Sequence, residues 1–168
     1  MQLHSPDLEK FKCDEPWEAL EILKSDGENV REGWSVQSFK ETEQPHILDM
    51  QSDLIDKIQV RYNLLERKTE EVLLPKVLEY CTCVIVRILL LFGLLTGKFQ
   101  RKTKFSPDNH RNMNLSPEKI SDYFQLLEKV QIYLGIIPMI VWLPRVCVFV
   151  FLILLDIRLF QVQKIQSR

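Results

Sequence analysis

The sequence predicts an all-α membrane protein in which two apolar helical segments form an antiparallel pair or hairpin. Three observations predict this class. Two long apolar runs lie in the carboxyl-terminal half, an amphipathic, coiled-coil-like helix precedes them, and an acidic amino-terminal region contains few large apolar residues, which predicts that it is largely disordered. The predicted regions are residues 1–46, 47–75, 77–97, 98–129, 130–156 and 157–168.

The amino-terminal region is polar and acidic. Residues 1–76 contain 10 Lys or Arg against 17 Asp or Glu. A helix is predicted over residues 16–24, with Asp14 as its cap and Pro16 in its first turn. Beyond that helix, large apolar side chains are too few to build a core, which predicts disorder or folding on a partner. These scattered residues are Val30, Trp34, Val36 and Phe39.

A heptad-like pattern follows over residues 47–74. Apolar residues recur seven apart in two interleaved series, although Gln51 and Thr69 occupy two of the core positions. This spacing predicts an amphipathic helix that ends at Pro75 and that pairs in a coiled coil, packs on its own chain or lies against the bilayer. The residues predicted for the helix interface are Leu48, Ile55, Ile58, Tyr62, Leu65 and Val72.

The first apolar run covers residues 77–96 and is about one bilayer long. Arg87 near its centre costs roughly 2.5 to 3.5 kcal/mol on insertion, which the surrounding Leu and Ile offset. This intramembrane charge either extends toward the lipid headgroups or pairs with an acid on a partner helix. Cys81 and Cys83, at the amino-terminal edge of the run, are candidate acylation sites.

The loop at residues 98–129 is basic, with 7 Lys or Arg against 4 Asp or Glu. Its position directly after an apolar run predicts contact with lipid headgroups. A second helix is predicted to begin at Ser116, where a cap residue precedes a first-turn proline. The predicted headgroup-binding residues are Lys98, Arg101, Lys102 and Lys104.

The second apolar run, residues 130–155, carries a single charge, Arg145. At about 1.5 Å per residue, a helix of this length exceeds the ~30 Å hydrocarbon core of a bilayer. Pro138 and Pro144 interrupt helical hydrogen bonding and leave two geometries open. The run is either a kinked spanning helix or a wedge that bends near Trp142 at the membrane interface.

No motif in the sequence identifies a reaction. It has no nucleotide-binding loop, no Gly-x-Ser-x-Gly elbow, no His-Glu-x-x-His helix and no paired Cys-x-x-Cys. We therefore expect no catalytic, cofactor-binding or metal-binding residues. Nucleic acid is not an expected partner, because the basic residues do not form one concentrated face.

These observations predict a non-enzymatic integral membrane protein that acts as an anchor or adaptor through its cytosolic helix. The alternative is a membrane-shaping hairpin or an accessory subunit of a channel or transporter, which uses Arg87 and Arg145 within the membrane. The expected partners are the lipid bilayer and either a second copy or a helical protein. The expected location is a membrane, with the endoplasmic reticulum or another endomembrane favoured.

Overall fold

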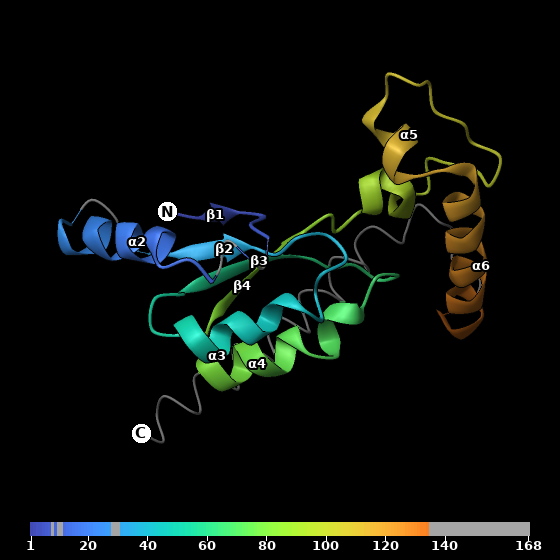
Figure 1. The fold of residues 1–168 in the computed structure, drawn as a ribbon. Coiled ribbons are helices and arrows are strands. Elements are labelled where there is room, and N and C mark those ends of the chain that lie inside the picture. Colours follow the sequence, from blue (N-terminus) through green and yellow to red (C-terminus); the bar gives the residue numbers. More distant parts are fainter. Residues whose placement is uncertain (8, 10–11, 28–30, 135–168) are drawn as a thin grey trace. The chain divides into compact units, whose positions relative to one another are not determined.

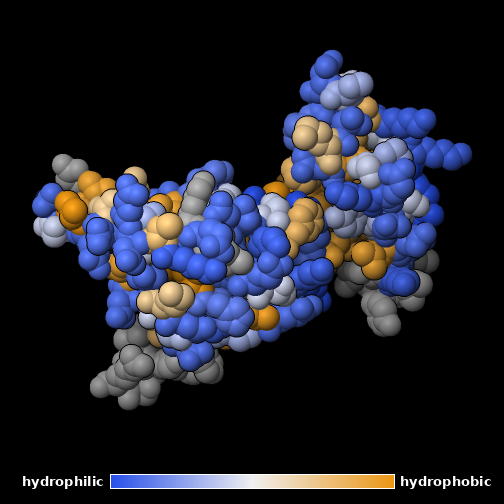
Figure 2. Space-filling view, viewed as in Figure 1, coloured by the Kyte–Doolittle hydropathy of each residue, from blue (hydrophilic) through white to orange (hydrophobic). Residues whose placement is uncertain are grey.

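The computed structural model describes residues 1–7, 9, 12–27 and 31–134 (Figure 1). The chain divides into two compact units. Within the described residues, unit 1 comprises Met1–Tyr62 and Glu66–Arg87, and unit 2 comprises Asn63–Leu65 and the residues from Ile88 to Leu134. Hydrophilic side chains cover most of the surface visible in Figure 2, and apolar side chains form smaller groups between them.

Unit 1 is built on a parallel sheet of four strands whose spatial order follows the sequence. Each strand pairs with the next in the parallel direction. Parallel neighbours cannot be joined by a tight turn, so each connection crosses over the sheet. The strands are β1 (Leu3–His4), β2 (Gly33–Ser35), β3 (Lys57–Arg61) and β4 (Cys83–Arg87).

Helices occupy every one of these connections. Crossovers between parallel strands are almost always right-handed, so strands added in one direction place their helices on the same face of the sheet. Helices α3 and α4 lie side by side in Figure 1 and contact each other. The connecting helices are α2 (Glu15–Ser25), η1 (Gln44–Ile47) with α3 (Leu48–Gln51), and η2 (Lys68–Glu70) with α4 (Leu73–Tyr80).

The strand register gives the sheet one apolar and one mainly polar face. Trp34, Ile58 and Val84 are aligned across β2, β3 and β4, and the first two are fully buried. Because side chains alternate along a strand, the next row, with Ser35 and Gln59, belongs to the opposite face.

Helix α2 confirms the helix predicted in the amino-terminal region. The carbonyl of Asp14 accepts hydrogen bonds from the amides of Trp17 and Glu18, at 2.9 Å each, while the Asp14 side chain makes no cap bond. Trp17 and Leu20 are buried on one face. The capping residue therefore acts through its backbone.

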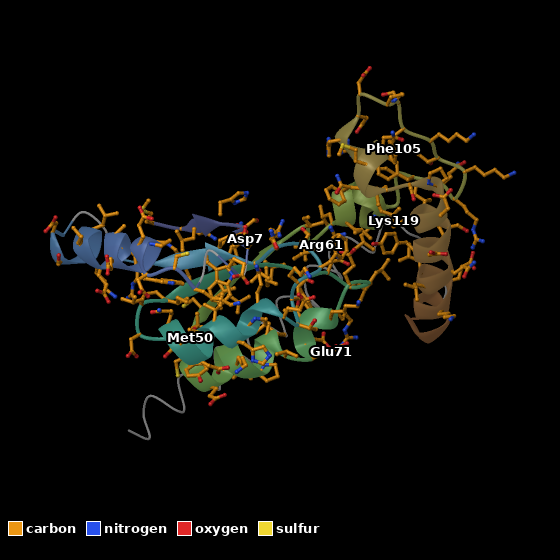
Figure 3. All side chains as sticks on the ribbon, viewed as in Figure 1. Asp7, Met50, Arg61, Glu71, Phe105 and Lys119 are labelled. Carbon is orange, nitrogen blue, oxygen red and sulfur yellow. The ribbon has the colours of Figure 1, made fainter. Side chains whose placement is uncertain are left out.

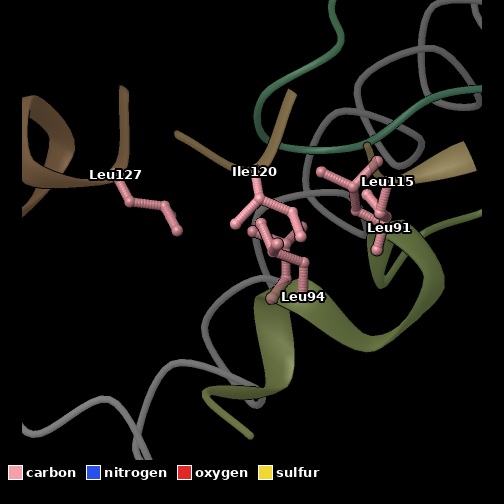
Figure 4. Packing of buried hydrophobic residues seen from close by; sticks show 6 residues of the cluster. Leu91, Leu94, Leu115, Ile120 and Leu127 are labelled. Carbon is pink, nitrogen blue, oxygen red and sulfur yellow. The ribbon is translucent and has the colours of Figure 1, made fainter. Parts of the chain in front are cut away.

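Unit 2 is a helical cluster. Its elements are η3 (Leu91–Thr96), α5 (His110–Asn114) and α6 (Pro117–Leu134). Helix α6 confirms the helix predicted from Ser116, whose hydroxyl accepts the amide of Lys119 at 3.4 Å. Figure 4 shows the buried side chains pointing toward one another. They are Leu91, Leu94, Leu95, Leu115, Ile120 and Leu127.

The all-α membrane fold predicted from the sequence is therefore wrong. Residues 57–61 of the predicted coiled-coil-like helix form strand β3, because Ile58 and Val60 alternate with polar residues. The first apolar run forms part of α4, strand β4 and all of η3, and not one continuous helix. The predicted disordered region contributes Trp34 and Val36, both fully buried.

None of the helices among the described residues has both the length and the apolar character needed to cross a bilayer. Most of the second apolar run, with Pro138, Trp142, Pro144 and Arg145, lies outside the described residues. The same holds for the predicted polar tail at residues 157–168.

Gly33 fixes the close approach of β2 to β3. A Cβ atom at this position would lie 2.4 Å from the carbonyl oxygen of Lys57. We expect Gly33→Ala to lower the free energy of unfolding by about 1–3 kcal/mol, because two paired backbones must separate. Gly27→Ala is the control, since its Cβ would meet nothing within 4 Å and only the left-handed φ of 73° is strained. Urea denaturation should show the larger loss for Gly33→Ala; equal losses would contradict this account.

Asp49 links α3 to α4. Its Oδ1 accepts hydrogen bonds from Nζ of Lys76 and, at 2.8 Å, from the hydroxyl of Tyr80. Hydrogen bonds from Lys76, and then from Tyr80, hold the pKa of Asp49 below its ordinary value. A depressed folded-state pKa stabilises the protein above the ordinary carboxyl pKa, and this contribution is lost as the pH falls through the folded-state value.

We expect Asp49→Asn to lower the urea midpoint at pH 6 and to have little effect well below pH ~4, where the carboxylate is protonated in both states. Asp53→Asn, at an exposed position just after α3, is the control. Midpoints measured from pH 6 to pH 2.5 check this. A difference between Asp49→Asn and the unmodified chain that stays constant over that range would contradict the linkage.

Candidate functional site

Two arginines end neighbouring strands of the sheet. Arg61 is the last residue of β3 and Arg87 the last of β4, and the two are aligned in the register. Figure 3 labels Arg61 at this end of the strands. In α/β folds the carboxyl ends of parallel strands carry the ligand site, because the connecting loops converge there. This edge of the sheet is therefore the candidate site.

Arg61 is paired with the carboxylate of Glu66 through two of its nitrogens. Its Nε donates to Oε2 of Glu66 at 2.6 Å, and a second guanidinium nitrogen pairs with the other carboxylate oxygen. The side chains of Arg61 and Glu66 are only 5% and 16% exposed. The guanidinium carbon lies 4.6 Å from the ring centroid of Phe39. Arg61 thus serves as a fixed support at this edge.

Arg87 holds the loop that follows β2. One of its terminal nitrogens donates to the carbonyl of Val36 at 2.7 Å and to the hydroxyl of Ser38 at 3.2 Å. Its Nε is buried and has no hydrogen-bond partner among the described residues. Burial and the nearby charge of Arg61 lower the pKa of Arg87, and the opposing charge of Glu41 does not cancel them. An anion at this position would therefore be stabilised.

Ser35 and Gln59 stand beside each other on the polar face. Ser35 is fully buried, and its Oγ has no partner among the described residues. Gln59 is aligned with it on β3, and its Oε1 accepts Nε2 of Gln2 at a long 3.5 Å. A hydroxyl and a carboxamide each donate and accept hydrogen bonds. The pair can therefore bind an uncharged polar group such as an amide.

Tyr62 follows Arg61 but is not a reactive group. Its hydroxyl donates to Glu70, which also accepts two hydrogen bonds from Arg67 at 2.7 and 2.8 Å. Burial, and then the hydrogen bond to Glu70, raise the pKa of Tyr62 well above its ordinary value. Tyr62 is therefore a neutral structural donor that ties η2 to β3.

The residues predicted for a helix interface do not lie on one helix. Leu48 is in α3, Ile58 is in β3 and Val72 caps α4. Ile55 precedes β3, and Tyr62 and Leu65 follow it. The first four in sequence, Leu48, Ile55, Ile58 and Tyr62, are all buried within unit 1.

The predicted intramembrane arginines and acylation sites lie in different places. Arg87, expected within a membrane, is part of the candidate site at the end of β4, whereas Arg145 lies outside the described residues. Cys81 caps α4 in a left-handed conformation and Cys83 is exposed on β4, and both thiols are free. Their acylation stays a prediction.

The basic residues expected to bind lipid headgroups are exposed in unit 2. Arg101 is paired with Glu128 at 2.6 Å. Binding of headgroups by this loop stays a prediction. The four residues are Lys98, Arg101, Lys102 and Lys104.

Sequence reasoning missed Ser35, Gln59 and Arg61 as site residues. The signal that could have found Gln59 and Arg61 is the strict alternation of polar and apolar residues from Lys57 to Tyr62, which is typical of a half-buried strand. Ser35 lies outside that stretch and is brought to Gln59 only by the pairing of β2 with β3. No group of three or more His, Cys, Asp or Glu residues in the described parts of the chain is placed to hold a metal ion.

Comparison with solved structures identifies a similar protein, the glycerol dehydrogenase AKR11B4 from Gluconobacter oxydans, an aldo-keto reductase. The two are 30% identical, with a TM-score of 0.57 over 80% of this chain. This chain spans 41% of the length of that protein. No family model matches the sequence, and the comparison with curated proteins gives no match.

This similarity also corrects the predicted function. The sequence predicted a non-enzymatic membrane anchor, or a membrane-shaping or channel subunit, located in a membrane. The matched protein is an enzyme, and the parallel α/β sheet resembles that enzyme's fold and not a pair of membrane helices. The physical reason is that three short elements, α4, β4 and η3, follow one another in sequence and together produce an apolar run as long as a membrane segment.

The pairing of Arg61 with Glu66 can be tested by double substitution. We expect Arg61→Met to cost about 3 kcal/mol, because it leaves the half-buried Glu66 carboxylate without this partner. Replacing both residues, Arg61→Met with Glu66→Leu, should cost less than the single change. Chemical denaturation of these two variants and of Glu66→Leu completes the cycle, and a double change that costs the sum of the two single changes would show that the pair is not coupled.

Proposed function

We propose that this chain carries part of an oxidoreductase barrel of the aldo-keto reductase kind and that the carboxyl edge of its sheet binds a nicotinamide nucleotide. The observation that carries this proposal is a pair of buried polar atoms at one edge that have no hydrogen-bond partner among the described residues, the Nε of Arg87 and the Oγ of Ser35. The side chain of Gln59 is aligned with Ser35 on the neighbouring strand. The similarity to a glycerol dehydrogenase supplies the reaction class.

The strand order supports a barrel. In an eight-stranded (β/α) barrel every strand is parallel to its neighbours and follows them in sequence, whereas a doubly wound sheet reverses its order. The four described strands follow the barrel order without a reversal. Four strands are half of such a barrel, which agrees with a chain that spans 41% of the matched enzyme.

The residues at this edge fit a nicotinamide nucleotide. Its carboxamide both donates and accepts hydrogen bonds, as do the side chains of Ser35 and Gln59. Its phosphate is an anion, and Arg87 offers a buried donor in a positively biased environment. Ser35 and Gln59 would orient the ring end of the ligand, and Arg87 would bind the phosphate end.

When bound, such a nucleotide accepts or donates the hydride that interconverts an alcohol and a carbonyl. The matched enzyme is named for glycerol. A small polyol is therefore the substrate class that we propose for the complete enzyme. Within this chain, the role of the described residues is to bind and orient the nucleotide.

Binding of NADPH and NADH, followed by their fluorescence, tests the proposal. We expect Arg87→Met to weaken binding about ten- to a hundredfold, because a hydrogen bond to a charged group is lost. Ser35→Ala should weaken it less, since its hydroxyl is uncharged. Lys12→Met is the control for loss of one positive charge, because Lys12 is exposed and pairs with Glu9, three positions away, at 2.8 Å.

Thermal denaturation must show that each variant remains folded, because Arg87 also holds the loop after β2. Arg87→Lys provides a second readout, since it keeps the charge and should retain part of the affinity. No binding of either nucleotide by the unmodified chain, or equal affinities for Arg87→Met and Lys12→Met, would contradict the proposal.

A further inference from the structure

Phe39 is an exposed aromatic residue in the turn after β2. It is 60% exposed and its φ is 67°, in the left-handed region that bulky residues rarely adopt. Its amide donates to Oε1 of Glu41 at 3.0 Å, and Glu41 itself is only 5% exposed. A buried carboxylate thus holds the backbone in a conformation that directs this ring outward.

The ring is also supported from within the protein. The guanidinium of Arg61 lies 4.6 Å from its centroid, a distance at which a cation attracts the face of an aromatic ring. Arg61 cannot easily follow the ring if it moves, because Glu66 binds two of its nitrogens. Phe39 therefore rests on a rigid support.

The position of Phe39 in the chain brings it next to the proposed phosphate donor. The preceding residue, Ser38, accepts a hydrogen bond from Arg87 at 3.2 Å. Isolated exposed apolar residues are common on protein surfaces and need no function. Phe39 differs from such residues in three ways. Its backbone is strained, a cation supports its ring, and the residue before it binds Arg87. All three features lie at the same edge of the sheet.

We propose that Phe39 is the platform on which the heteroaromatic ring of a nucleotide stacks while Arg87 binds its phosphate. This inference rests on the proposed function and adds the residue that distinguishes a nucleotide from a simple sugar phosphate. Stacking on an aromatic side chain accepts any planar base, so the shared chemistry is a planar heterocycle joined to a ribose phosphate.

Three small ligands separate the contribution of the heteroaromatic ring to binding from that of the phosphate. Nicotinamide mononucleotide and AMP carry a ring and a phosphate, whereas ribose 5-phosphate carries the phosphate alone. Titration calorimetry with the full chain should show that Phe39→Ala weakens binding of one or both nucleotides about tenfold. Its affinity for ribose 5-phosphate should not change. The nucleotide that loses affinity identifies the stacked ring.

Two further variants control for structure. Phe39→Trp should restore nucleotide binding, because it keeps an aromatic face. Phe39→Leu should not, although it keeps an apolar contact with Arg61. Unfolding temperatures of all three variants show whether the turn remains folded.

The outcomes distinguish this inference from the function on which it rests. Arg87→Met could lower the affinity for all three ligands while Phe39→Ala lowers the affinity for none. In that case the phosphate site is supported and the stacking role of Phe39 is wrong. Equal weakening of ribose 5-phosphate by Phe39→Ala would also overturn it, since the residue would then act through the turn. If Arg87→Met changes no affinity, the proposed function itself fails.

Discussion

The backbone register of β3 against its two neighbours determines the rest of unit 1. Ile58 is aligned with Trp34 on one side and Val84 on the other, and Gln59 is aligned with Ser35 and Ile85. A slip of one residue would turn every apolar side chain of β3 to the polar face. The same pairing that builds the apolar face therefore also assembles the polar groups of the candidate site.

Charge at the carboxyl edge is arranged unequally between two aligned arginines. Arg61 has a bidentate partner in Glu66. Glu41 raises the pKa of Arg87 through its charge, but it does not form an ion pair with Arg87 within 4 Å among the described residues. Arg61 is thus engaged by a carboxylate of the protein, whereas the Nε of Arg87 can still donate a hydrogen bond to a ligand. This division explains how two like charges are tolerated side by side at the edge of a sheet.

Parts of this fold could be predicted from the sequence. Helices α2 and α6 follow from local signals, a first-turn proline with a cap residue, which act within a few positions along the chain. Strand β4 could not be recognised, because a short apolar run between flanking apolar helices has no periodicity of its own. The seven-residue spacing of Leu48, Ile55 and Tyr62 arises by coincidence from a helix, a loop and the end of a strand.

The candidate site depended on contacts between distant residues. Ser35 and Gln59 are adjacent only through the pairing of β2 with β3, and Arg87 reaches Val36 across 51 positions of sequence. Single-residue signals for these positions do not exist. Phe39 was read as an isolated apolar residue in a tail, since neither its left-handed backbone nor its contact with Arg61 is encoded in local composition.

The agreement between strand order in space and strand order in sequence has a further consequence. The outer edges of β1 and β4 run in the same direction, and among the described strands each of these two pairs on one side only. A second segment of the same kind could therefore be fused after β4 and continue the sheet without inverting any strand. Duplication and recombination of gene segments can enlarge such a protein while the pairings of β1 with β2, β2 with β3 and β3 with β4 stay in place.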